Sequence, residues 1–114
     1  LNNSQKNLLE KLKKEGLNGL EERTIKSFPN GIKDIKVLSA LKLAIYLEEG
    51  IYYHVDIYNK VKNLILKGSK SKDIITIAFV KEKTGLSRKY VIPLLNVLER
   101  EKLLKRQGND RVVI

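Results

Sequence analysis

The sequence predicts a fold that is mostly α with small β-hairpins, an α+β chain in which one small unit occurs twice. Apolar residues recur at intervals of three and four in several segments, which is typical of amphipathic helices. In residues 43–55 the apolar spacing changes to two, which indicates strands. Residues 103–114 form a second predicted hairpin after a second set of helices, so the order of elements repeats.

The first half of the chain is predicted to begin with three helices. Ser4 is expected to cap the first helix, and Gly16 is expected to end it. A second helical pattern covers residues 20–28 and is closed by the Pro-Asn-Gly turn that follows. A third helix is expected to begin after Asp34 and to carry an apolar stripe as far as Leu41.

A hairpin follows these helices. Residues 43–47 and 51–55 alternate apolar and polar positions, and the Glu-Glu-Gly segment between them supplies the turn. Three helices followed by a two-stranded hairpin is the order of a winged helix, in which the hairpin is the wing.

The second half repeats this order. Asp56 is expected to cap a helix that ends at Gly68, and residues 74–76 are expected to form a short strand. Thr76 then caps a short helix, and Ser87 begins the next helix. The inward stripe of that last helix consists of Val91, Leu94, Leu95 and Leu98.

The last predicted hairpin has arms at residues 103–106 and 111–114, joined by a Gly-Asn-Asp turn. Two tandem winged helices account for the whole chain, with domains at residues 1–55 and 56–114.

The composition makes several classes of function unexpected for this chain. With no Cys and a single His, neither thiolate chemistry nor a His-rich metal cluster is expected. The absence of a phosphate-cradling Gly-rich loop adds to the expectation that this chain is not an enzyme. No apolar run approaches the roughly 18 residues of a membrane span, so a cytoplasmic chain with no membrane partner is expected. Because it begins with Leu1 and contains no Met, it is expected to be a piece of a longer protein.

The net charge of +10 is unevenly distributed. Residues 1–57 hold nine Lys and Arg against eight Asp and Glu, whereas residues 58–114 hold fourteen against five. A basic half beside a neutral half indicates a polyanion partner for the basic one. A solvated Lys-rich surface would give the same composition.

The segment GLSRKYVIP, residues 85–93, predicts an anion site. The free N–H groups of a helix start attract anions, and Arg88 and Lys89 add two charges in the first turn after Ser87. Pro93 lacks the N–H that would bond the carbonyl of Lys89, so we hypothesise that the first turn is tilted.

This segment also carries a family resemblance. Residues 85–95, GLSRKYVIPLL, and residues 106–111, RQGNDR, resemble the last winged-helix repeat of the bacterial selenocysteine-specific elongation factor SelB. The matching pattern is Gly-Leu-Ser-Arg-Lys-Tyr-X-X-Pro-Leu-Leu followed by Arg-X-Gly-X-X-Arg in the wing. The resemblance covers about residues 51–114, while residues 1–49 match only in the order of elements.

The resemblance implies that this chain is the mRNA-binding end of a translation elongation factor for selenocysteine incorporation. Its partner would be the selenocysteine insertion (SECIS) hairpin of an mRNA. The parent protein would be a GTPase, with GTP and Mg in absent domains, that delivers selenocysteinyl-tRNA to the ribosome. No cofactor and no metal site are expected in this fragment, and a monomer is expected.

RNA recognition suggests roles for six residues. The deep, narrow major groove of A-form RNA excludes a recognition helix, so proteins grip hairpin phosphates and unpaired bases instead. Arg106 and Arg111, on opposite arms of the wing, would form an exposed phosphate clamp, and Tyr90 could stack on a base or pack in the core. The candidate RNA-binding residues are Ser87, Arg88, Lys89, Tyr90, Arg106 and Arg111.

Two alternatives stay open. A tandem winged-helix transcription regulator would share the basic second half, although the chain has no evident dimerisation helix. A protein-interaction adaptor would use the nearly neutral first half.

Overall fold

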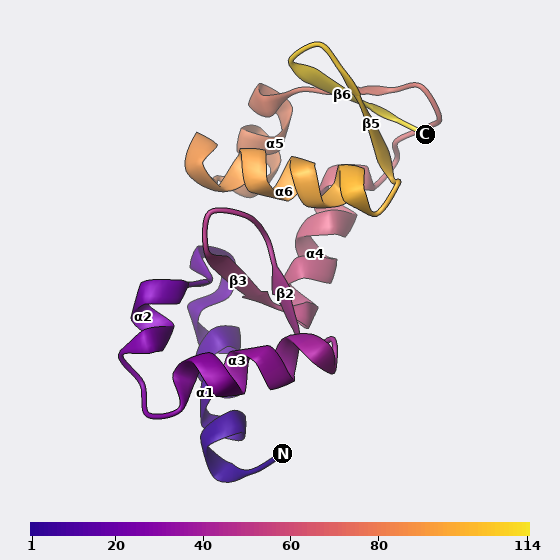
Figure 1. Cartoon of the computed structure of the whole chain (residues 1–114). Coiled ribbons are helices and arrows are strands. Elements are labelled where there is room, and N and C mark those ends of the chain that lie inside the picture. The colour runs from indigo at the N-terminus through magenta and orange to yellow at the C-terminus, as the bar shows by residue number, and fades with distance from the viewer. The chain divides into compact units, whose positions relative to one another are not determined.

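A computed structural model describes residues 1–114, which fold as two compact units, residues 1–59 and 60–114 (Figure 1). The mostly helical α+β fold class is confirmed, with the tandem order of helices and small sheets. The domain boundary after residue 55 stays a prediction; helix α4, Val55–Leu66, runs across that point. No helix has the length and apolar character needed to cross a bilayer.

The first unit contains three α-helices, a 3₁₀ turn and a three-stranded antiparallel sheet in the order β1-β3-β2. The elements are α1 Asn3–Glu15, η1 Gly16–Asn18, β1 Leu20–Glu21, α2 Glu22–Lys26, α3 Gly31–Ala40, β2 Ala44–Tyr46 and β3 Ile51–His54. The core is formed by Leu8, Leu12, Leu20, Ile25, Ile35, Leu38 and Ala44.

The second unit follows the same plan, with its sheet in the order β4-β6-β5. After α4 come β4 Ile74–Ile75, α5 Ile77–Thr84, α6 Arg88–Arg100, β5 Leu104–Gln107 and β6 Asp110–Val113. The predicted inward stripe of α6 is confirmed, because Val91, Leu94, Leu95 and Leu98 are all buried. Thr76 caps α5 as expected, since its hydroxyl accepts a hydrogen bond from the N–H of Phe79 at 3.0 Å.

The first helix begins earlier than the sequence pattern suggested. Asn2, not Ser4, is the N-cap: its side chain accepts from the N–H of Gln5 at 2.8 Å, and the Gln5 side chain accepts from the N–H of Asn2 at 2.9 Å. This reciprocal capping box satisfies two helix N–H groups at once, which a cap at Ser4 cannot do. Gly16 ends the helix as predicted.

The predicted helix over residues 20–28 is wrong at its start. Leu20 and Glu21 pair with Tyr52 and Ile51 of β3, so they extend the sheet, and α2 begins at Glu22. The strand is only two residues long, too short for an alternating pattern to reveal it.

The third helix also begins earlier than expected, at Gly31 rather than after Asp34. Asn30 adopts a left-handed conformation with φ 59°, which reverses the chain immediately before the helix. A Cβ on Gly31 would lie 1.9 Å from the carbonyl oxygen of Ile25, so only glycine permits this approach. The helix ends before Leu41, which is exposed instead of extending the apolar stripe.

Helices α3 and α6 end in the same turn. Lys42 and Lys102 adopt left-handed conformations with φ 61° and 62°. The next residue, Leu43 or Leu103, donates its N–H to the carbonyl of Leu38 or Leu98 at 2.9 and 3.0 Å. This is the Schellman arrangement, and it sets the same path from helix to wing in both units.

Helix α4 is capped by His54 rather than by Asp56. The imidazole Nδ1 of His54 accepts a hydrogen bond from the N–H of Asp56 at 3.0 Å, and the Asp56 carboxylate lies 3.8 Å from the same nitrogen. His54 is buried, and burial lowers its pKa; the charge of Lys13 also lowers it, whereas Asp56 raises it. Because Nδ1 accepts a hydrogen bond, this cap requires the neutral imidazole.

We therefore expect the stability of the first unit to fall as the pH is lowered. The folded state binds the His54 proton more weakly than the unfolded chain, so stability is constant well above pH 6.5 and declines below it. Urea unfolding between pH 7.5 and pH 5.5 measures this decline. His54→Asn keeps a capping acceptor but cannot titrate, so its pH dependence should be flatter; an unchanged slope would assign the effect to other groups.

Candidate nucleic-acid interface

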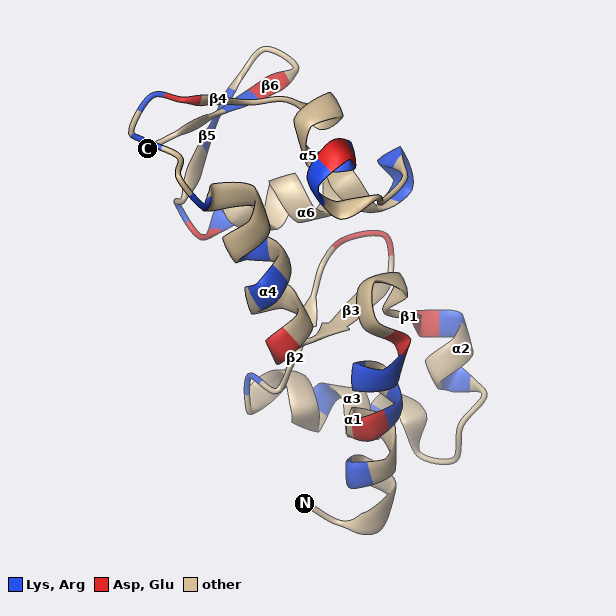
Figure 2. Ribbon diagram, turned by 180° about the vertical axis from the view of Figure 1, so that it is seen from behind, with Lys and Arg blue, Asp and Glu red and all other residues tan.

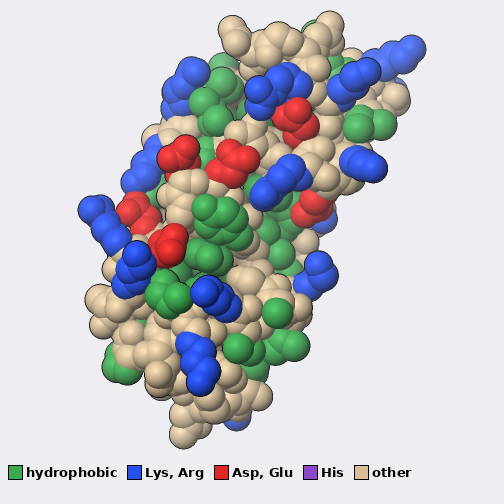
Figure 3. Space-filling model, viewed as in Figure 1, with side chains coloured by type: hydrophobic (Ala, Val, Ile, Leu, Met, Phe, Trp, Pro, Cys, Tyr) green, Lys and Arg blue, Asp and Glu red, His purple; other side chains and the backbone are tan.

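The second unit carries nearly all of the excess positive charge. Residues 60–114 contain fourteen Lys and Arg against five Asp and Glu, a net of +9. Lys and Arg positions lie on α4, at the start of α6 and on β5 (Figure 2). The space-filling view shows Asp and Glu among the Lys and Arg side chains (Figure 3). On the face shown, charge alone does not outline a binding surface.

The start of α6 presents an exposed cationic turn. Ser87 is the N-cap, as predicted, but its side chain makes no capping hydrogen bond. Arg88 and Lys89 are the first two helical residues, both side chains are exposed, and no acidic residue lies in this turn. Helix starts favour anions, so two cations here make the turn more attractive to phosphate.

Tyr90 is half-buried, with the Nζ of Lys89 5.6 Å from the centre of its ring. Pro93 lies buried inside α6. Its ring nitrogen cannot donate to the Lys89 carbonyl one turn earlier, so the first turn is joined to the rest of the helix by one hydrogen bond fewer. The tilt that we hypothesised for this turn stays a hypothesis.

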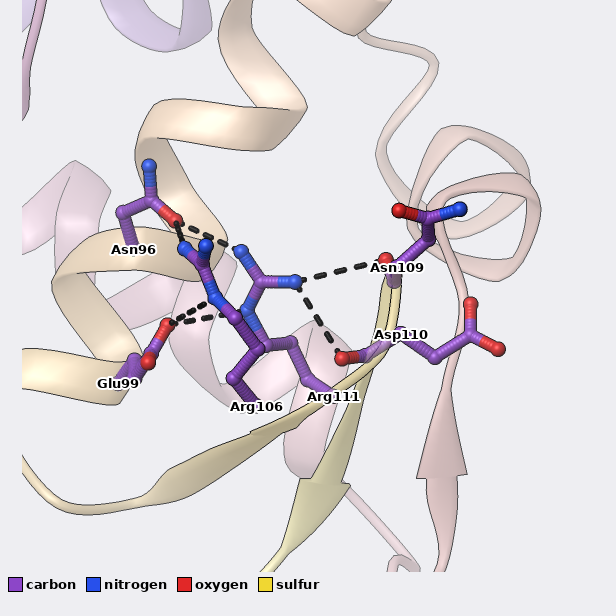
Figure 4. A network of polar contacts seen from close by, with 6 residues as sticks. All are labelled: Asn96, Glu99, Arg106, Asn109, Asp110 and Arg111. Carbon is purple, nitrogen blue, oxygen red and sulfur yellow. Dashed lines mark hydrogen bonds and ion pairs between the residues drawn. The ribbon is translucent and has the colours of Figure 1, made fainter.

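The two wing arginines face each other. Arg106 on β5 and Arg111 on β6 are directly paired across the hairpin. Both guanidinium groups extend toward α6, where they meet the side chains of Asn96 and Glu99 (Figure 4). Because residues three apart share one face of a helix, Asn96 and Glu99 act together as a single acceptor site.

The same two oxygens serve both arginines. Asn96 Oδ1 accepts from Nη2 of Arg111 at 2.7 Å and from Nη2 of Arg106 at 3.1 Å. Glu99 Oε2 lies 3.2 Å from Nε of Arg111, an ion pair without hydrogen-bond geometry, and accepts from Nε of Arg106 at 3.4 Å. The cluster of two cations and one carboxylate keeps a net charge of +1.

The two arginines differ in exposure. The Arg106 side chain is 55% exposed, whereas that of Arg111 is 7% exposed. Arg111 also donates from Nη1 to the backbone carbonyls of Asn109 and Asp110, at 3.5 and 3.3 Å, and so ties down the wing turn. The expectation that both clamp residues are exposed is therefore wrong for Arg111, because α6 and the turn enclose it.

A hollow of about 260 Å³ lies between α6 and the wing. It brings together three of the six predicted residues, Arg88, Arg106 and Arg111. Ser87, Lys89 and Tyr90 do not line it. The remaining walls are Ile77, Ile92, Leu95, Asn96, Gly108 and Asn109, so apolar and cationic groups meet in one depression.

Asn96 and Glu99 were missed by sequence reasoning. Their signal was present: in the segment VIPLLNVLE the core positions are apolar, and two polar residues three apart mark a second face of α6. The sequence does not show that the wing folds back toward α6. This packing brings Arg106 of β5 and Arg111 of β6 onto that face.

The first unit has no such arginine pair. Counted from the shared turn at the helix end, Tyr46 occupies the position of Arg106, and its cross-strand partner is Tyr52. The two rings lie 5.0 Å apart between centroids. Burial and the nearby Glu22 carboxylate raise the pKa of Tyr52, which keeps its phenol neutral at neutral pH. The wing turn carries Glu48 and Glu49, which disfavour phosphate.

A family model supports the assignment of the second unit. Residues 69–113 match a model described as "Elongation factor SelB, winged helix". This span contains α5, α6 and the wing, including the hollow. No curated protein sequence matches the chain.

Two solved structures are similar to the whole chain. A bacterial selenocysteine-specific elongation factor EF-Sec matches with 28% identity and a TM-score of 0.79 over 99% of this chain. The chain spans only 18% of that protein's length. The mRNA-binding domain of Escherichia coli elongation factor SelB, solved in complex with SECIS RNA, matches in fold with 18% identity. Its TM-score is 0.71, and the match covers 99% of this chain and 98% of that one.

Loss of the acceptor site formed by Asn96 and Glu99 should lower the stability of the second unit. Glu99→Ala leaves two facing arginines, one of them buried, without this carboxylate, and should lower the free energy of unfolding of the second unit by about 1–3 kcal/mol. Urea unfolding followed by the NMR signals of the second unit measures the change. Glu82→Ala removes the same charge from an exposed position of α5 and should change stability by less than about 0.5 kcal/mol. Equal effects of the two variants would contradict the assigned role.

Proposed function

Starting from the confirmed similarity to the C-terminal winged-helix region of the SelB elongation factors, we propose that this chain binds an mRNA hairpin through its second unit. The hairpin would be a SECIS element. Binding would hold a selenocysteine-specific elongation factor on its message.

One observation carries the proposal: Arg88 and the two wing arginines line one hollow, beside the exposed cationic start of α6. Charge gathered at a concave site suits a bent phosphate backbone, because several phosphates can be contacted at once. The half-buried side chains of Ile77 and Ile92 offer apolar contact to an unpaired base. A hairpin supplies both features, whereas a regular duplex supplies only phosphates.

The wider role follows from the same proposal. The parent protein would be a GTPase whose other domains hold GTP and Mg and deliver selenocysteinyl-tRNA to the ribosome. This chain would contribute binding rather than catalysis, as a cytoplasmic monomer without a cofactor of its own.

The first unit favours a different kind of partner. It is nearly neutral, and its wing combines an aromatic pair with a glutamate turn. These features suit a protein surface better than a nucleic acid, so the adaptor hypothesis is retained for this unit alone. A DNA-regulator function for the second unit predicts that the chain binds duplex DNA as tightly as an RNA hairpin.

The intact chain should distinguish RNA hairpins from duplexes. In vitro selection from an RNA pool with a randomised loop and bulge should yield a tightest-binding sequence, called here the selected hairpin. The chain should prefer it over duplex DNA of equal length by at least roughly 1000-fold, because duplex DNA lacks unstacked bases and 2′-hydroxyls. Filter binding at fixed salt measures the ratio. Equal affinity for the two would remove hairpin recognition and favour the DNA regulator.

The cationic start of α6 should contribute directly to affinity. Arg88→Ala or Lys89→Ala should weaken binding of the selected hairpin by about 1–3 kcal/mol and reduce the slope of log affinity against log salt by about one. Thermal stability should barely change, because both side chains are exposed.

Lys33→Ala is the matched control for these variants. Lys33 is an exposed cation in the first turn of α3, the helix of the first unit that corresponds to α6. Its removal should leave the affinity and the salt slope unchanged. A loss equal to that of Arg88→Ala would show that RNA binds diffusely over both units.

A further inference from the structure

The candidate motif contains two wing arginines, but the structure treats them differently. Arg106 is exposed and contacts only side chains of α6 among the hydrogen bonds and ion pairs described above. Arg111 is enclosed and bonds both to α6 and to the backbone of the wing turn. A phosphate can displace an exposed partner of Arg106 at small cost, since exposed ion pairs contribute little.

Arg111 has no comparable freedom. Its Nη2 donates to Asn96 at 2.7 Å, the shortest contact of the cluster, and its Nη1 is directed to the carbonyls of Asn109 and Asp110. To reach a phosphate outside the wing, the Arg111 side chain, only 7% exposed, would have to leave its enclosed position and give up its hydrogen bonds to Asn96 and to the wing turn. That exchange is costly because hydrogen bonds made by a charged group contribute more to stability than neutral ones.

We propose that Arg111 is a positioning residue and Arg106 is a phosphate contact. Through Asn96, Arg111 fixes the wing turn against α6 and thereby sets the direction in which Arg106 and the hollow face the RNA. This inference rests on the proposed RNA function. It assigns different roles to two arginines that the sequence pattern presents as equivalent.

The planar guanidinium is essential to this role. Arg111 uses the fork of its guanidinium to reach an amide oxygen on one side and two carbonyls on the other, in addition to the ion pair with Glu99. A lysine in the same place keeps the charge but offers one ammonium at the end of a flexible chain, so it cannot span these partners. A phosphate contact, in contrast, depends mainly on charge and tolerates lysine better.

The test therefore compares Lys and Gln at both positions in the full chain. For Arg111, Lys and Gln should each weaken binding of the selected hairpin by at least about tenfold, the loss expected for one charge-assisted hydrogen bond, and should leave the salt slope unchanged. For Arg106, Gln should weaken binding and lower the salt slope by about 0.7 to 0.9, the value of one phosphate contact. Arg106→Lys should keep the slope and lose clearly less affinity than Arg111→Lys.

A second readout needs no RNA. In the Arg111 variants, the backbone amides of residues 107–110 should exchange with solvent faster, because the wing turn has lost its anchor. The Arg106 variants should leave this exchange nearly as it is. Asn96→Ala removes the anchor on α6 without changing any charge, so it should reproduce the faster exchange and the weaker binding with an unchanged slope.

Several results would overturn the assignment. Normal affinity of Arg111→Lys together with a reduced salt slope of Arg111→Gln would make Arg111 a phosphate contact. If the Arg111 variants fail to fold, Asn96→Ala decides: normal RNA affinity and normal exchange in this variant would refute the positioning role. Failure of the proposed function is seen separately, because the unaltered chain would then bind the selected hairpin no better than duplex DNA, which would end both proposals.

Discussion

Two guanidinium groups that face each other across a hairpin repel, and the second unit is organised around the compensation of that repulsion. One amide oxygen of Asn96 accepts hydrogen bonds from both arginines, and one carboxylate oxygen of Glu99 accepts from Arg106 and forms an ion pair with Arg111. The same helix buries its apolar stripe in the core, so the acceptors are held rigidly by a well-packed element. The hollow and the wing turn held by Arg111 lie where the hairpin attaches to α6.

Much of the fold could be predicted because it depends on local patterns. The buried stripe of α6, the Thr76 cap and both hairpins follow from spacing, capping chemistry and turn residues. Two of the errors occur where a contact outside the local pattern decides. Leu20 is a strand residue because it pairs with β3, and Gly31, the first residue of α3, lies so close to the carbonyl of Ile25 that only glycine fits there. No periodicity within either segment contains that information.

The candidate site shows the same division. The basic start of α6 could be located from the sequence, since its Ser-Arg-Lys order is local. The enclosure of Arg111 could not, because it depends on how the hairpin folds back onto one face of the helix that precedes it. A sequence motif records that two arginines are present, and only the packing shows that one is exposed and the other enclosed. Charge patterns therefore locate a surface better than they assign roles to its residues.

The identical left-handed lysine turns at the ends of α3 and α6 have a consequence for the chemistry of the two wings. Each turn forms a joint of the same geometry between the helix and the first strand of the wing. Between the two units, the joint is the same while the side chains beyond it differ. Lys36, Ser39, Tyr46 and Tyr52 occupy the places that Asn96, Glu99, Arg106 and Arg111 fill in the second unit. The same joint thus precedes an aromatic wing in one unit and a cationic wing in the other, so two wings of one fold can present different chemistry.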